Sequence, residues 1–527
     1  MILTLSLLWT VIICKVYTLS LFEARCLRFD PGRYYSNSTV TALAFIPAKT
    51  TLQFPDNDQS CKRPSQLIPQ DICRIAMSLP TSHRSSIIFE AWFPSNWSGR
   101  FLATGNGGID GCIRYEDMAY ATSNGFAAVG SNNGHNGTTG VSFDENDDIV
   151  TDFAWRSLHT ITGFGKKILH VFYEKHHSKS YYLGCSLGGR QGIKATMKFP
   201  SDYDGVVAGS PAVDFNHMIS WRGSFYPMTG GSGDARYVDQ ALWKGLVHEE
   251  VLRQCDTLDG AKDGIIEDPT RCNFDPGALL CGSDAVHAGS TTCLGTAQVE
   301  AVRRIFKPMT GAHGEILYPA MQPGSEDKAS EGLYNGAPWP YSLDWYRYVV
   351  YDPSWNGSRM TPRDIQAAES RNPSNIRTFP RQLHEFKARG GKILTFHGQQ
   401  DNQISSFNSN RLWDRLNIGM SGDLDSFYRF FRISGMNHCN TGPGAWVFGQ
   451  GGGVSAAGVP FESSQNILAA LVDWVEYGRA PEHIVGTKFV NDTVLAGQHF
   501  QRRHCKYPAT NTFVGTDPYD VDSWECH

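Results

Sequence analysis

Hydrophobic and polar positions follow two alternating patterns in the parts of the chain that flank residues 210–378. Short apolar runs indicate buried strands, because a strand covered on both faces is apolar throughout. Apolar residues at helical spacing, such as Leu158, Ile161 and Ile168, indicate helices between these strands. The strands predicted in this way are 86–93, 100–104, 125–130, 180–183, 205–209, 392–396 and 427–433. The predicted helices are 155–174, 190–198, 380–391 and 466–477. This alternation predicts an α/β fold with a sheet at its core.

Residues 210–378 have a different texture, with many glycines and prolines, four cysteines and no clear alternation of strands and helices. A chain of 527 residues also exceeds the usual size of a single domain. We therefore expect residues 210–378 to form an inserted, loop-rich domain. The sheet core would then be built from two parts, 21–209 and 379–527.

The N-terminus carries an apolar run from Ile2 to Cys14. This run is too short to span a bilayer, but it fits the apolar region of a secretory signal peptide. We expect a signal peptide over residues 1–20, with cleavage near Thr18 or Ser20, and no membrane anchor. The alternative is a buried N-terminal strand.

The remaining twelve cysteines and the asparagine sequons agree with export. An even number of cysteines fits disulfides formed in an oxidising compartment. No pair of cysteines has the close spacing of a zinc ribbon. Five Asn-x-Ser/Thr sequons are candidate glycosylation sites: Asn37, Asn96, Asn136, Asn356 and Asn491. Together these features predict a secreted, extracellular glycoprotein.

The charge distribution bears on the class of partner. The formal net charge is -5, and no block of like charges is long enough to suggest a nucleic-acid surface. We expect a small-molecule substrate and no nucleic acid.

One short motif carries candidate chemistry. Residues 184–188, Gly-Cys-Ser-Leu-Gly, fit the pattern Gly-x-Ser-x-Gly between the predicted strand 180–183 and helix 190–198. A strand-to-helix turn sharp enough to expose Ser186 crowds its neighbours and favours glycine beside it. The alternative is a tight glycine turn with a solvated serine.

A serine hydroxyl is a poor nucleophile without a base and an acid that orients the base. Asp401, in HGQQD, and His438, in GMNHC, each follow a predicted strand. We therefore assign Ser186 as nucleophile, His438 as general base and then general acid, and Asp401 as the orienting carboxylate. His397 is the competing base, but a histidine at the start of the Asp401 turn more often makes a structural hydrogen bond.

Backbone donors for an oxyanion are expected from two places. The N–H of Leu187, directly after the nucleophile, is the first. The glycine-rich loop 105–108, which follows the predicted strand 100–104, would supply the second through Gly107 or Gly108. The alternative for this loop is a plain turn.

Two cysteines adjoin the predicted catalytic residues. Cys185 precedes Ser186 and Cys439 follows His438, so one bridge between them would hold the two catalytic loops together. For a loop this long, chain-entropy estimates give about 5 kcal/mol of stabilisation. The alternative is that both cysteines pair elsewhere.

This constellation resembles the tannase and feruloyl esterase family of secreted α/β-hydrolases. The resemblance rests on Cys185-Ser186, Asp401 and His438-Cys439, with support from GNGG at 105–108, GGRQG at 188–192 and CDTLDGAKDGIIEDP at 255–269. It covers the chain from about Cys26 to Cys526. The resemblance implies a serine esterase with an α/β-hydrolase core and an inserted, loop-rich lid domain at 210–378.

The resemblance also implies six disulfide bridges, although the sequence alone allows many other pairings. The implied pairs are Cys26–Cys73, Cys61–Cys112, Cys185–Cys439, Cys255–Cys272, Cys281–Cys293 and Cys505–Cys526.

A structural Ca²⁺ is implied for the acidic stretch 256–265, because a hard cation takes oxygen ligands and two glycines here permit a tight curl. By resemblance, the ligands are the side chains of Asp256, Asp259 and Asp263 and the carbonyl oxygens of Ala261 and Ile265. The alternative is a solvated acidic turn. No redox or nucleotide cofactor is implied.

The substrate class is also taken from the resemblance. The length of the chain and its lid resemble feruloyl esterases of type B, so we expect hydrolysis of feruloyl and p-coumaroyl esters of plant cell-wall polysaccharides through an acyl-enzyme. The alternatives are a tannase acting on galloyl esters and a non-catalytic binding protein, although the latter usually lacks the nucleophile or the base. Seven aromatic residues lie within 335–355, and we expect most of them to form the core of the lid.

Overall fold

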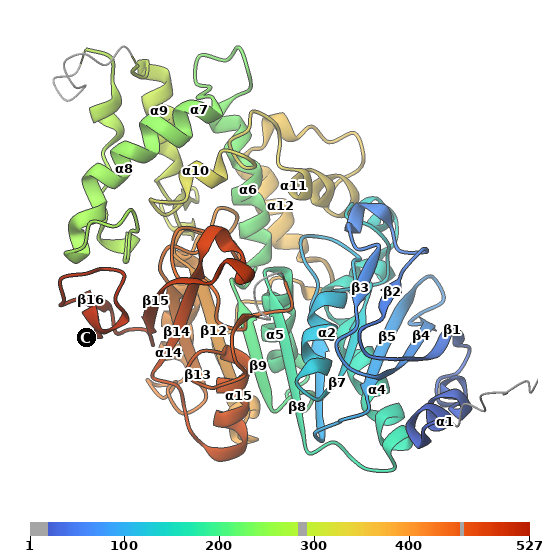
Figure 1. The fold of residues 1–527 in the computed structure, drawn as a ribbon. Coiled ribbons are helices and arrows are strands. Elements are labelled where there is room, and N and C mark those ends of the chain that lie inside the picture. The colour runs from blue at the N-terminus through green and yellow to red at the C-terminus, as the bar shows by residue number, and fades with distance from the viewer. Residues whose placement is uncertain (1–18, 283–291, 454–457) are drawn as a thin grey trace, which may run out of the picture.

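The computed structural model describes residues 19–282, 292–453 and 458–527; most of the predicted signal peptide 1–20 lies outside them. A nine-stranded mixed sheet forms the centre of the molecule, with strand order β1-β4-β5-β7-β6-β8-β9-β12-β13 (Figure 1). Its strands are β1 (Thr39–Ile46), β4 (Ile72–Pro80), β5 (Ser86–Pro94), β6 (Arg100–Thr104), β7 (Phe126–Ser131), β8 (Lys179–Cys185), β9 (Gly205–Gly209), β12 (Lys392–Gly398) and β13 (Tyr428–Ile433). The α/β fold is confirmed.

Strand direction divides the sheet into two regions. The strands β1, β4, β5 and β7 pair antiparallel, whereas β7, β6, β8, β9, β12 and β13 pair parallel. The carboxyl ends of parallel strands meet at one edge of a sheet. Loops that follow β8, β12 and β13 therefore lie close together, although they are far apart in the sequence.

Helices cover both faces of the sheet, because the central strands, such as β7 and β9, are buried along their whole length. Two hydrophobic core clusters lie on the two faces of the sheet. Leu158, Ile161 and Ile168 of the helix Ser157–Tyr173 are buried in the first cluster, and Leu468 of the helix Ile467–Tyr477 is buried in the second. On the first face lie α4 (Ser157–Tyr173), α5 (Leu187–Lys198) and α14 (Phe407–Gly419), and on the second lie α2 (Tyr115–Ser123) and α15 (Ile467–Tyr477). Shorter helices are α1 (Leu21–Arg28), α3 (Asp147–Thr151) and α13 (His384–Ala388).

The segment 210–378 is inserted between β9 and β12 and lies beyond the carboxyl ends of the strands, at the top of Figure 1. It is richer in helices than its sequence texture predicts. Its helices are α6 (Phe215–Thr229), α7 (Gln240–Leu242), α8 (His248–Cys255), α9 (Thr296–Ile305), α10 (Glu326–Ala329), α11 (Pro340–Trp345) and α12 (Pro362–Arg371). Buried aromatic and aliphatic residues of most of these helices form a third core cluster, which residues outside the segment, such as Phe153 and Leu187, join.

Four small two-stranded sheets complete the fold. They pair β2 (Thr51–Gln53) with β3 (Ser65–Leu67), β10 (Met309–Thr310) with β11 (Ile316–Tyr318), β14 (His483–Phe489) with β15 (Gln498–Cys505), and β16 (Asn511–Phe513) with β17 (Trp524–Cys526).

Six disulfides join the chain in the pairs that the resemblance implies. They are Cys26–Cys73, Cys61–Cys112, Cys185–Cys439, Cys255–Cys272, Cys281–Cys293 and Cys505–Cys526.

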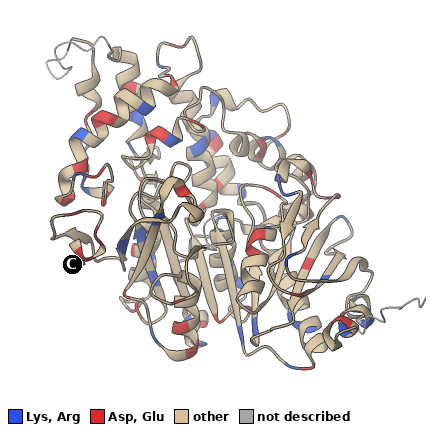
Figure 2. Ribbon diagram, in the orientation of Figure 1, with Lys and Arg blue, Asp and Glu red and all other residues tan. Residues whose placement is uncertain are grey.

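Charged residues of both signs are spread over the helices and loops, while most of the central sheet is uncharged (Figure 2). None of the helices in the described ranges combines the length and the apolar character needed to cross a bilayer.

Candidate active site

Ser186 stands on a sharp turn between β8 and α5. Its backbone has φ 64° and ψ -120°, a conformation that L-residues rarely adopt and that costs about 1–3 kcal/mol. The turn brings Gly184 so close to Gly188 that a Cβ on Gly184 would lie 2.9 Å from the Gly188 backbone. Glycine is therefore required at this crossing, and the serine side chain is displayed at the carboxyl edge of the sheet.

His438 and Asp401 complete a hydrogen-bonded chain with Ser186. The Ser186 hydroxyl donates to His438 Nε2 at 2.8 Å, and His438 Nδ1 donates to Asp401 Oδ2 at 2.7 Å. A carboxylate can only accept, so the proton of the neutral imidazole resides on Nδ1 and Nε2 is free to accept. The structure therefore brings the three predicted residues together from the loops after β8, β12 and β13.

Asp401 is fully buried and accepts four hydrogen bonds. Its Oδ1 accepts the backbone N–H groups of Gln403 and Ile404, both at 2.8 Å, and its Oδ2 accepts from His438 and from His397 Nε2, the latter at 3.1 Å. Burial by itself raises the pKa of Asp401, but the two histidines outweigh burial and hold the pKa well below its usual range. The carboxylate therefore stays ionised beside the base.

His397 contacts the acid of this chain and is not hydrogen-bonded to the serine. Its side chain is fully buried, Nε2 also lies 3.2 Å from the Ile404 carbonyl oxygen, and Nδ1 lies 2.7 Å from Ser409 Oγ. These contacts agree with the structural role expected for His397.

The Cys185–Cys439 disulfide links the two catalytic loops next to the reacting groups. Its Cα atoms lie 6.1 Å apart across a sequence separation of 254 residues. Cys439 has φ 64°, so the loop bends sharply directly after His438. The bridge thus ties the residue before the nucleophile to the residue after the base.

The glycine-rich loop 105–108 is held against the start of α5. Gly188 N–H donates to the Asn106 carbonyl at 2.9 Å, and Asn106 N–H donates to Gln191 Oε1 at 3.0 Å. Gly107 N–H lies 3.3 Å from Asp110 Oδ1. Leu187 is the first residue of α5, where a backbone N–H has no partner within its own helix. Both expected donor segments therefore flank Ser186.

A cavity of about 570 Å³ opens onto Ser186 and His438. Gly107 and Gly108 line it, as does Tyr341, the one residue of the aromatic-rich stretch 335–355 that does so. Most of the other aromatic residues of that stretch pack in or against the core of the inserted segment, as expected, whereas Tyr351 is exposed.

Several pocket residues lack a clear signal in the sequence. They are Arg114, Glu116, Asp117, Gln403, Trp446 and Gln450. The charged run at 114–117 and the short distance of Trp446 from His438 along the chain are the features that could have indicated them.

One wall of the cavity carries opposite charges. Glu116 accepts from Arg63 at 2.6 Å, and Arg114 lies 3.6 Å from Asp110. Burial, and then the neighbouring Glu116, raise the pKa of Asp117 to about 6. This wall is therefore polar, whereas Tyr341 and Trp446 supply aromatic surface.

The acidic stretch 256–265 forms a tight loop after α8. Asp256 Oδ1 accepts from Gly264 N–H at 3.0 Å, and Asp259 Oδ1 accepts from Ala261 N–H at 2.8 Å. Asp259 Oδ2 is buried and has no hydrogen-bond partner in the described structure. Burial, together with Asp263, raises the pKa of Asp259 to about 6. Asp263 differs, because Arg502 donates to it at 2.6 Å.

Among the described residues, one group of three potential metal ligands gathers within 4.8 Å: Asp214, His217 and Glu369. The aspartates of the acidic loop are not gathered this closely. Arg411 lies 3.6 Å from Asp214, and Arg377 forms an ion pair with Glu369. These arginines already neutralise the negative charges of the two carboxylates, so no metal ion is needed to compensate them.

Comparison with known proteins shows the family of this chain. The sequence model of the family described as "Tannase and feruloyl esterase" matches residues 73–354 and 370–527. A relative from Aspergillus flavus named "Probable feruloyl esterase B-2" is 54% identical over 489 residues, covering 92% of this chain and 93% of that protein.

Solved structures agree as well. The crystal structure of feruloyl esterase B from Aspergillus oryzae has a TM-score of 0.91 and 44% identity, covering 96% of this chain and 100% of that chain. A tannin acyl hydrolase from Aspergillus niger shares the fold, with a TM-score of 0.72 at 19% identity over 96% of this chain and 94% of that chain. This chain therefore belongs to the tannase and feruloyl esterase family, a family of carboxylic ester hydrolases.

Proposed function

We propose that this protein is a secreted serine esterase that hydrolyses feruloyl and p-coumaroyl esters of plant cell-wall polysaccharides. The observation that carries the proposal is the hydrogen-bonded chain Ser186–His438–Asp401 at the mouth of a partly aromatic cavity. The names of the relatives favour hydroxycinnamate esters over galloyl esters.

In the first half of the reaction, Ser186 Oγ attacks the ester carbonyl while His438 Nε2 takes the hydroxyl proton. The ionised Asp401 holds the imidazole and stabilises its positive charge. Leu187 N–H and a donor from Gly107 or Gly108 stabilise the oxyanion. The bond to the sugar oxygen then breaks, and the sugar hydroxyl leaves with the proton from His438.

In the second half, water attacks the carbonyl of the acyl-enzyme. His438 accepts a proton from this water and returns it to Ser186 Oγ as the bond to the acyl group breaks. The aromatic acid is released and the enzyme is restored.

Substrate binding is assigned to the two kinds of cavity surface. Tyr341 and Trp446 offer aromatic faces to a hydroxycinnamoyl ring. The charged wall at Arg114 and Asp117 suits the polar sugar side of the ester.

Secretion is proposed from the signal-like N-terminus, the disulfides and the sequons. The five sequon asparagines are all exposed in the structure, which glycan attachment requires: Asn37, Asn96, Asn136, Asn356 and Asn491.

A structural Ca²⁺ is proposed for the acidic loop 256–265. The buried, unpartnered Asp259 Oδ2 fits a cation, and so do the raised pKa values of Asp256 and Asp259, for each of which burial is the largest cause. Asp256, Asp259 and Asp263 would bind through their carboxylates, and Ala261 and Ile265 through their carbonyl oxygens. When bound, the ion cross-links the loop and takes no part in acyl transfer.

The test is hydrolysis of methyl ferulate and methyl gallate side by side, with Ser186→Ala as the blank. Turnover of ferulate that is lost in Ser186→Ala is the expected result. Turnover of gallate alone would make the protein a tannase. Failure of a serine-reactive phosphonate to label Ser186 in the folded protein would contradict an esterase and favour a binding protein.

A further inference from the structure

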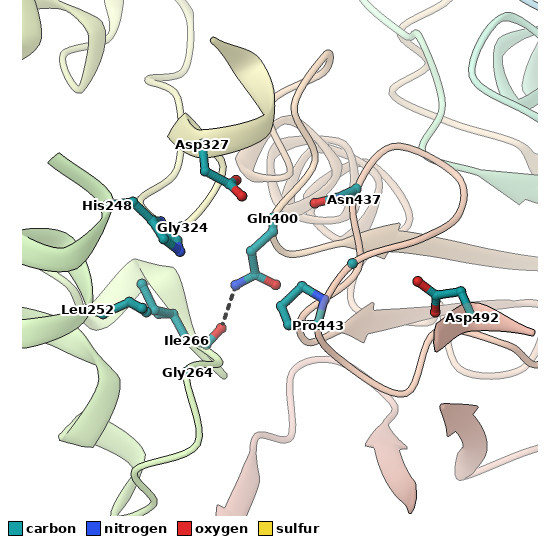
Figure 3. A pocket seen from close by; sticks show the side chains of 11 residues that line it. His248, Leu252, Gly264, Ile266, Gly324, Asp327, Gln400, Asn437, Pro443 and Asp492 are labelled. Carbon is teal, nitrogen blue, oxygen red and sulfur yellow. Dashed lines mark hydrogen bonds between the residues drawn. The ribbon is translucent and has the colours of Figure 1, made fainter. Parts of the chain in front are cut away.

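A second cavity, of about 270 Å³, shares the loop that carries His438 (Figure 3). Residues 438–441 line the catalytic cavity, whereas Asn437, Gly442 and Pro443 line the second one. The opposite side comes from the inserted segment 210–378, including His248 and Asp327. One loop therefore forms a wall common to both cavities.

Gln400 lines this second cavity and carries an unsatisfied acceptor. Its side chain is 3% exposed, and Nε2 donates to the Ile266 carbonyl oxygen at 2.9 Å. A carbonyl oxygen can only accept, so the amide nitrogen must face Ile266 and Oε1 must face away from it. Gln400 Oε1 is buried without a hydrogen-bond partner in the described structure, and Figure 3 shows it directed toward Pro443. A ligand hydroxyl would supply the missing donor.

The other lining residues supply both donors and acceptors. His248 Nδ1 donates to Glu326 at 2.5 Å; burial lowers the pKa of His248, but Glu326 outweighs burial and raises it. Asp327 provides carboxylate oxygens, and the Asn437 amide can both donate and accept. Asp492 also lines the cavity, but its Oδ1 already accepts from Lys488 Nζ at 2.6 Å and from Trp446 Nε1 at 2.8 Å.

This mixture of groups selects the chemistry of the ligand. The Asp327 carboxylate, which forms no ion pair within the described residues, disfavours an anion. No Phe, Tyr or Trp is among the residues that line this cavity, which disfavours a flat hydroxycinnamate. The one group of three close metal ligands among the described residues, Asp214, His217 and Glu369, does not line this cavity, so a metal ion is disfavoured as its ligand. A neutral polyol fits, because each hydroxyl can donate to Gln400 or a carboxylate and accept from an imidazole or amide. We propose that this cavity binds one neutral sugar unit.

This proposal does not depend on ester hydrolysis, since the cavity contains none of the catalytic residues. It nevertheless has a link to catalysis, because Gln400 precedes Asp401 and Asn437 precedes His438. The sugar can come from two sources: the saccharide chain of an ester substrate, or a free saccharide. The experiment separates them.

The first measurement is calorimetric titration of the full-length protein with D-xylose, L-arabinose and xylobiose. We expect saturable binding of at least one of them. Leu252→Trp, which fills the cavity, should abolish this binding, and Asp327→Asn should weaken it about tenfold by removing one charged acceptor. Glu249→Gln is the matched control, because it removes a carboxylate from the exposed surface of α8 outside the cavity and should leave binding unchanged.

The second measurement compares kcat/KM for methyl ferulate and for a feruloylated xylo-oligosaccharide in wild type and Leu252→Trp. A loss confined to the oligosaccharide ester assigns the cavity to the substrate chain. Unchanged kcat/KM for both, with sugar binding lost, assigns it to a free saccharide. The proposal is overturned if wild type binds none of the three sugars, or if Leu252→Trp and Asp327→Asn both bind as tightly as wild type.

Discussion

Removing the Cys185–Cys439 disulfide is expected to reduce turnover far more than removing a disulfide distant from the catalytic cavity. The bridge adjoins both Ser186 and His438, whose side chains are 2.8 Å apart. A displacement of about 1 Å between reacting groups can lower a rate about 100-fold. We therefore expect Cys185→Ala/Cys439→Ala to lose about two orders of magnitude in kcat.

The effect on stability follows from the length of chain that the bridge closes. A bridge across 254 residues lowers the chain entropy of the unfolded state, which corresponds to about 5 kcal/mol of stabilisation of the folded state. This is an upper bound, because the other five bridges already restrict the unfolded chain. The Cys505–Cys526 bridge, with a separation of 21 residues, corresponds to about 3 kcal/mol and is the matched control. Neither Cys505 nor Cys526 lines the catalytic cavity.

The assay measures kcat on methyl ferulate at a temperature where circular dichroism shows both double variants to be folded. Urea unfolding of the same samples measures stability. The expected result is a large loss of kcat in Cys185→Ala/Cys439→Ala and wild-type kcat in Cys505→Ala/Cys526→Ala. Equal kcat values in the two folded variants would refute the positioning role of the first bridge.

Three further predictions concern single residues. His397→Phe should lower kcat on methyl ferulate about tenfold with little change in KM, because Asp401 loses a hydrogen bond, and His397→Gln should recover most of the loss. Burial lowers the pKa of His504 to about 4, below the unfolded value of about 6.5, so the unfolded state binds more protons between these values. Stability should therefore fall by up to about 3 kcal/mol from pH 6.5 to pH 4, as measured by urea unfolding, and His504→Gln should show a smaller change. Chelation of Ca²⁺ should lower the melting temperature of wild type but not of Asp259→Ala; an ion at 100 times its dissociation constant contributes about 2.7 kcal/mol.

Each of these predictions has an outcome that contradicts it. Equal kcat in wild type and His397→Phe would remove His397 from the support of Asp401. The same pH dependence of unfolding in wild type and His504→Gln would mean that His504 does not control acid stability. A melting temperature of wild type that does not respond to a chelator and to added Ca²⁺ would exclude a stabilising ion in the acidic loop.

The parallel half of the sheet could be predicted from the sequence because each of its strands contains a short, mainly apolar run. The predicted strands 100–104 and 205–209 coincide with β6 and β9. By contrast, β1 and β4 were not predicted. The strand β1 is exposed or half-buried along its whole length and carries no clean alternation, so pairing with β4 defines it.

Helices were harder to predict where tertiary packing replaces periodicity. The helix α6 has buried residues on all sides, including Asn216 and Arg222, so its sequence lacks a polar face. The predicted helix 380–391 was too long, since only α13 (His384–Ala388) is helical there. Leu383 lies just before this helix, and its N–H contacts the Met420 sulfur, a partner that local sequence does not indicate.

The hydrogen-bonded residues of the candidate site were easier to predict than the walls of its cavity. Ser186, Asp401 and His438 each follow a strand and belong to short motifs. Arg114 and Trp446 line the same cavity from segments more than 300 positions apart, so only the folded chain shows that they meet.

The two ends of the inserted segment meet at adjacent strands of the sheet. Gly209 of β9 is paired with Phe396 of β12, and just beyond the sheet Asp214 N–H donates to the Thr378 carbonyl at 3.1 Å. The segment thus leaves and rejoins the core at nearly the same point. A whole segment from a relative could therefore be transplanted as one cassette, with two neighbouring splice points, while the strands that present Ser186, Asp401 and His438 keep their pairing. The architecture lends itself to chimaeras in which selectivity and catalytic chemistry are varied separately.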